Sequence, residues 1–143
     1  MSYTSDLLDD LARLLHEHGV GTYRPEGMYA PGETAIAIAT TPPAPDRIIC
    51  LAAYPVTDSA VLTDTTTGVQ VRTRAGADPR EVDGLDDAVF DVLHGSGPHL
   101  FGSVRVQLIY RVSAAPIGAD ASGRMERTSN FYVRAHRAHP HLE

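Results

Sequence analysis

The sequence contains no lysine, so all twelve of its basic residues are arginine. A P-loop needs a lysine after its glycines to reach the phosphates, and Schiff-base catalysis needs a lysine amine. The absence therefore argues against P-loop, kinase and Schiff-base functions together. Arginine, in contrast, suits the planar, bidentate ion pairs found at subunit interfaces.

Cysteine and long apolar runs are also scarce. The single cysteine, Cys50, cannot form an internal disulfide, and its place in the apolar run IICLAAY predicts a buried, inert thiol. The longest apolar stretches, at 35–39 and 48–53, are shorter than the ~20 residues that a membrane-spanning helix needs. The amino terminus, MSYTSDLLDD, is acidic where a secretory signal is basic. We therefore expect synthesis in the cytoplasm and no membrane partner.

The overall charge is negative, with 12 basic and 18 acidic residues giving a net −6. This balance argues against tight nucleic-acid binding, which relies on neutralising phosphates. A length of 143 residues, with 43% hydrophobic and 21% charged, is ordinary for one globular core. We expect a single domain over residues 1–143, with an extended loop or hairpin arm at 113–127 and a frayed tail from residue 138.

Two helices are predicted. From residue 4 to 18, leucines recur at helical spacing on one side, and Gly19 is a natural stop. The second helix begins at Asp78, because D-P-R-E supplies a capping side chain, a proline in the first turn, and Glu81 to reach back. Gly95 is expected to end it.

The strands are predicted from apolar runs and alternation. Residues 34–41 and 48–56 resemble a buried hairpin, and residues 69–74, 104–112 and 128–137 alternate as strands do. The glycine- and proline-rich stretch 19–33 is expected to be a loop, either covering the sheet or contacting a partner. The expected fold is α+β, with a mostly antiparallel sheet of about five strands, two helices packed on one face, and the order αβββαββ.

A search for chemistry yields no site. Ser96 follows a helix, whereas a nucleophile elbow follows a strand. The histidines at 16 and 18 point in different directions on a helix, and those near the carboxyl end lack a rigid frame for a metal. Helix capping accounts fully for Asp78 and Glu81 as an acidic pair. We predict no catalytic residue, no cofactor, no metal site and no enzymatic activity.

Three segments carry a family resemblance: VQVRTRAG (69–76), DPREVDGLDDAVFDVLHG (78–95) and VRVQLIYRVSAAPIGADASGRMERTSNFYVRAHR (104–137). Their order resembles the minor capsid and tail-terminator proteins of long-tailed bacteriophages. In that family a loop like P-x-x-x-G-x-D-x-x-G-R precedes a last strand like S-N-F-Y-V. Here that loop is approximated by Pro116, Gly118, Asp120, Gly123 and Arg124.

The resemblance implies a non-catalytic virion protein, usually a homohexameric ring, at the head-proximal end of the tail. It would end tube growth in the tail neck, and its partners would be itself, the major tail tube protein and a head-completion or connector protein. DNA would pass through the ring as a non-specific contact only. The protein would be made in the cytoplasm of the host bacterium.

Two surfaces are candidate contact sites in such a ring. Arginines projecting from strands are expected to meet acidic residues of the second helix of a neighbouring subunit, since opposite charges suit a head-to-tail interface. The predicted interface residues are Arg72, Arg74, Arg105, Arg111, Asp86, Asp87 and Asp91. The arm at 113–127, with Gly118, Asp120, Gly123 and Arg124, is expected to reach the tube or connector.

An alternative from another class stays open at this point. A small intracellular binding module, of the adaptor or immunity type, could use the same sheet edge and loops.

Overall fold

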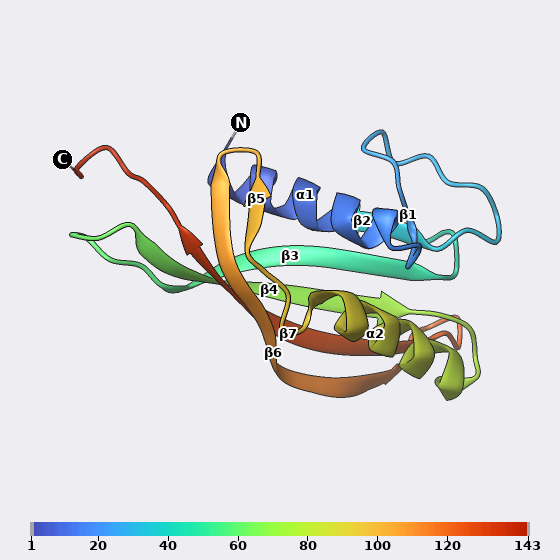
Figure 1. Cartoon of the computed structure of the whole chain (residues 1–143). Helices are drawn as coiled ribbons and strands as arrows, with labels where there is room; N and C mark the ends of the chain where they lie inside the picture. Colours follow the sequence, from blue (N-terminus) through green and yellow to red (C-terminus); the bar gives the residue numbers. More distant parts are fainter. Residues whose placement is uncertain (1, 143) are drawn as a thin grey trace.

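Within residues 2–142, which this computed structural model describes, seven strands form one mixed sheet that curls around two helices (Figure 1). The order across the sheet is β1-β2-β3-β4-β7-β6-β5. The elements in chain order are α1 (Tyr3–Glu17), β1 (Thr22–Tyr23), β2 (Ala35–Ile38), β3 (Ile48–Thr57), β4 (Asp64–Arg74), α2 (Pro79–Leu93), β5 (His99–Phe101), β6 (Val104–Ala119) and β7 (Met125–His136).

The expectation of a mostly antiparallel, five-stranded sheet in the order αβββαββ is therefore wrong. The described chain runs αββββαβββ, and the two unforeseen strands are β1 and β5. β1 has two residues and lies within the stretch expected to be a loop, while β5 has three. Strands this short do not show a period-2 pattern, so the sequence carries no alternation from which to predict them.

The predicted hairpin of residues 34–41 and 48–56 is also wrong, because β2 and β3 run parallel. Ala35 pairs with Ile48 and Ile38 pairs with Leu51. Residues 39–47 return the chain to the start of the next strand, and Ala39 takes a positive φ of 67° as β2 ends. β1 joins β2 in parallel as well, whereas the remaining four pairs of neighbouring strands are antiparallel.

Both predicted helices are confirmed, and both pack on the same face of the sheet. The side chain of Ser2 caps α1, and the carboxylate of Asp78 caps α2 by accepting from the backbone N–H of Arg80 at 3.0 Å. The leucine side of α1 and the apolar side of α2 meet one continuous core over the central strands. The other face of the sheet carries no helix over β4, β7 and β6 (Figure 1).

A β-bulge in β6 reverses the side-chain pattern that the sequence predicts. Val106 pairs with Ala135 and Leu108 pairs with Arg134, so Gln107 is an extra residue on one strand only. An extra residue sends the side chains that follow it to the opposite face, here as far as the next irregularity between Arg111 and Ser113. Ile109, which in an unbroken alternation would share a face with Arg105 and Arg111, is consequently fully buried, while Leu108 is exposed.

Deleting Gln107 should therefore leave the protein folded. Val106 and Leu108 would become consecutive residues opposite Ala135 and Arg134, as in a regular antiparallel ladder, so Ile109 would stay in the core and the melting temperature should change little. Deleting Arg105, which is itself paired with His136, should instead turn the buried Val104 toward solvent and lower the melting temperature. Thermal denaturation followed by circular dichroism would compare the two deletions; equal losses of stability would show that Gln107 is not the extra residue of the bulge.

Candidate functional site

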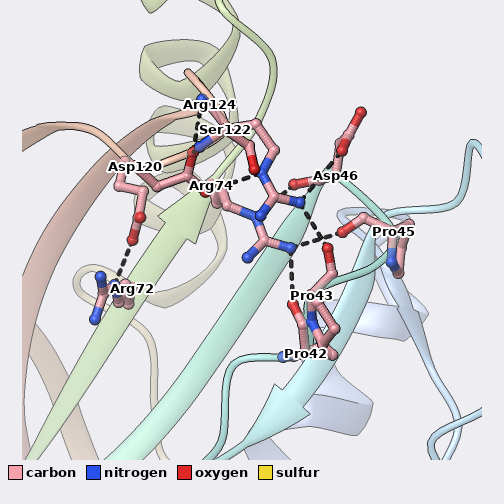
Figure 2. A network of polar contacts seen from close by, with 10 residues as sticks. Pro42, Pro43, Pro45, Asp46, Arg72, Arg74, Asp120, Ser122 and Arg124 are labelled. Atoms are coloured by element: carbon pink, nitrogen blue, oxygen red, sulfur yellow. Dashed lines mark hydrogen bonds and ion pairs between the residues drawn. The ribbon is translucent and has the colours of Figure 1, made fainter.

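Arg74, one of the predicted interface residues, lies inside the protein. Its side chain is 3% exposed and spans from the end of β4 to the connection 39–47 (Figure 2). Its Nε donates to the carbonyl of Asp46 at 2.9 Å, and its Nη2 donates to the carbonyls of Pro42 and Pro45 at 2.8 and 2.7 Å. Burial lowers the pKa of Arg74. The guanidinium thus holds the parallel crossover in place.

Arg124, predicted in the arm, reaches the same connection from the turn between β6 and β7. Its Nη1 donates to the carbonyl of Pro43 at 2.6 Å and lies 3.3 Å from Oδ1 of Asp46. Figure 2 shows both guanidinium groups directed at the proline-rich segment. We call Arg74, Arg124 and residues 42–46 the arginine clamp.

The clamp was not foreseen, although the sequence holds a signal for it. Prolines lack a backbone N–H but keep a carbonyl, so a segment such as PPAPD cannot form a regular hydrogen-bonded ladder. Its carbonyls are left for donors from elsewhere in the chain. Arginine offers five donors in a fixed fork, which matches several carbonyls at once.

The predicted arm is a β-hairpin with a tightly bonded tip. Asp120 accepts from the backbone N–H groups of Ser122 and Arg124 at 2.9 and 2.8 Å, and from Nε of Arg124 at 2.9 Å. The backbone N–H of Arg124 is the chief cause that lowers the pKa of Asp120. Gly118 and Gly123 take positive φ values of 104° and 80° beside this tip. Its role as a contact arm stays a prediction.

Arg111 and Asp86 meet within one protomer. After the bulge Arg111 points toward α2, with Nη1 3.6 Å from Oδ2 of Asp86 and its guanidinium 4.3 Å from the ring centroid of Phe90. Asp86 is 1% exposed and accepts from Oγ of Ser129 at 2.7 Å. Arg127 Nε lies 3.5 Å from the same carboxylate. These contacts fasten α2 to β6 and β7.

The other predicted interface residues remain at the surface. Arg72 is half exposed and bonded to the buried carboxylate of Glu126. Arg105, Asp87 and Asp91 are exposed. The structure does not test contacts between subunits, so the interface stays a prediction, and its solvent-facing members are the ones available to a neighbour.

Within residues 2–142, no three histidine, cysteine, aspartate or glutamate side chains gather in a way that could hold a metal ion. None of the helices in that range has the length and apolarity to cross a membrane. Burial raises the pKa of the Cys50 thiol, which lies against the carbonyl of Thr40.

Comparison with known proteins gives one family and a related fold. A model of the bacteriophage tail terminator protein family matches residues 14–137. A chain from the virion of a native gene transfer agent particle superposes with a TM-score of 0.57 at 14% identity, covering 70% of this chain and 78% of that one. At this identity the likeness shows a shared fold. Comparison with curated proteins gave no match.

Removing the Arg74 guanidinium should destabilise the protein. Arg74→Met keeps the aliphatic stem but leaves the carbonyls of Pro42, Pro45 and Asp46 without this donor, one of them buried and two partly buried, which should cost about 3 kcal/mol. Urea denaturation would measure the change, with Arg80→Met, at a side chain 90% exposed, as the matched control. If both variants unfold at the same urea concentration, Arg74 does not hold the crossover.

Proposed function

This chain belongs to the bacteriophage tail terminator family, and we propose that it acts as a ring of identical subunits at the head-proximal end of a tail. Membership gives it a structural role in the tail of a phage-like virion. We infer that the ring ends growth of the tail tube and joins the tail to a head connector, without catalysis. The family match favours this role over the adaptor or immunity-type module.

The observation that carries the ring is that exposed arginines on β6 and β7 and exposed aspartates on α2 lie on different elements of one chain. Arg105 pairs in register with His136, which pairs with Asp64, so Arg105 lies where the β3–β4 hairpin leaves the sheet. Arg134, also exposed, is nearby in β7. A head-to-tail contact between different surfaces of identical subunits is the kind that closes into a ring.

The acidic counterpart lies on the helices. Asp87 and Asp91 are exposed on α2. On α1, partial burial and then the carboxylate of Asp9 raise the pKa of Asp10. Carboxylates that crowd one another in this way are stabilised in their charged form by a cationic side chain of a neighbouring subunit. The net charge of −6 also suits a ring through which DNA passes without adhering.

Reversing single charges should weaken the ring, and reversing both sides should restore it. Arg105→Glu and Asp91→Arg should each raise the concentration needed for assembly by about tenfold or more, because each places like charges together. Native mass spectrometry of the purified protein would report assembly. The combined Arg105→Glu, Asp91→Arg variant should recover it.

Arg80→Glu, which changes another exposed arginine, should assemble normally. If rings persist unchanged with Arg105→Glu, the interface lies elsewhere. That result would not contradict the proposal that the protein forms a ring. A wild-type protein that stays monomeric at particle-like concentrations would overturn the proposed function.

The hairpin tip at residues 120–124 is proposed to contact the adjoining tube or connector ring. Ala121 is exposed at the hairpin tip, so a larger side chain at this position should not disturb the hydrogen bonds of Asp120. Ala121→Arg should leave rings intact but prevent capping, giving tails of uncontrolled length in electron micrographs of complemented particles. His18→Arg, at an exposed residue just after α1, should give normal tails; normal tails with Ala121→Arg would refute the contact.

A further inference from the structure

The turn between β3 and β4 carries apolar side chains out into solvent. Val61 is 76% exposed and Leu62 is 57% exposed, within the otherwise polar stretch PVTDSAVLTDTTTG. The hairpin extends past the body of the molecule, away from α2 (Figure 1). We call Val61 and Leu62 the apolar tip.

The apolar tip is held in one conformation. Oγ of Ser59 accepts from the backbone N–H groups of Val61 and Leu62 at 3.2 and 3.0 Å. Thr65 Oγ1 donates across the hairpin to Asp58 Oδ1 at 2.7 Å, and Arg137 N–H donates to the carbonyl of Thr63 at 2.8 Å. A rigid apolar projection loses little entropy when it is buried by a partner, so it is suited to docking.

A matching hollow lies at the opposite end of the same two strands. A cavity of about 410 Å³ is lined by Tyr29, Pro31, Ala44, Pro45, Arg47 and Glu81, together with four neighbouring residues. Ala44 and Pro45 stand just before β3 begins, whereas the apolar tip follows its end. Ten residues of extended strand separate the two by roughly 30 Å. We call this hollow the end cavity.

Charges of both signs flank each of the two features. Near the hairpin end Arg105 and Arg134 are exposed, and so are Asp58 and Asp64. Around the end cavity the carboxylates of Asp46 and Glu81 are 75% and 48% exposed, and Arg47 lies 3.8 Å from Glu81. The apolar fit, and not net charge, therefore distinguishes the two ends. A projection and a hollow at opposite ends of one chain cannot meet within a protomer of this length, but they can meet between successive copies.

We propose that the apolar tip of each subunit inserts into the end cavity of the next copy of this chain. The contact deepens the ring proposed above and rests on it. Val61 and Leu62 bury their exposed surface against Pro31, Ala44 and Pro45. The arginine clamp shapes the cavity, because Arg74 holds the carbonyls of Pro45 and Asp46, which form part of one wall.

Cysteine cross-linking tests the contact directly. Leu62→Cys and Ala44→Cys in one chain should give a ladder of disulfide-linked oligomers under mild oxidation, seen on non-reducing gels. Mixing the two single variants should give dimers and nothing larger, since each chain then has one reactive end. Wild-type protein should give no ladder, because Cys50 is 6% exposed.

The control pair Val112→Cys, Ala44→Cys places a thiol at a side chain that is 43% exposed in the middle of β6, seven residues along the strand from Arg105 at the hairpin end, and it should not cross-link. As a second measurement, Val61→Ser, Leu62→Ser should keep the wild-type melting temperature while raising the assembly concentration by about tenfold or more.

The outcomes separate this proposal from the ring itself. If wild-type rings form but the Leu62–Ala44 pair gives no ladder, the tip does not occupy a neighbour's cavity. If the serine variant forms normal rings yet fails to cap tails, the tip serves a different protein, and the proposal is wrong. If wild type forms no rings, the proposed function fails first.

Discussion

The buried guanidinium of Arg74 is the interaction on which the less regular half of the fold depends. Three carbonyls of a proline-rich connection find their donors in one side chain that extends from β4. An unpaired carbonyl away from water is costly, so the connection follows the path on which those carbonyls are satisfied. That path brings the chain back to run β3 parallel to β2, and it builds a wall of the end cavity.

The two ends of the sheet consequently differ in character. At one end the chain is tied down by Arg74, by Arg124 and by the bonded turn at Asp120, and it encloses a hollow. At the other end the β3–β4 hairpin runs past the helices and exposes apolar side chains. A molecule with unlike ends is suited to contacts between different surfaces of the same chain, which agrees with a family whose members belong to phage tails.

Several features could be predicted from the sequence because their causes are local. The leucine spacing of α1 and the capping motif at Asp78 depend on residues within one or two helical turns. Both helices were therefore predicted close to their observed bounds. The family resemblance, which depended on the order of segments, is confirmed by the match over residues 14–137. The strands β4 and β7 were recognised in part, since each shows alternation over its central residues.

Sequence by itself determined the helices, the alternating strands and the family, because neighbouring residues and their order along the chain set these features. Only the tertiary structure decided the parallel pairing of β2 with β3, the reversal of β6 at Gln107, and which arginines stay outside. Arg74, Arg105 and Arg111 look alike in an alternating pattern. Arg74 is buried against carbonyls, Arg105 is exposed and Arg111 lies against α2. A bulge and a distant loop determine what each of these side chains contacts.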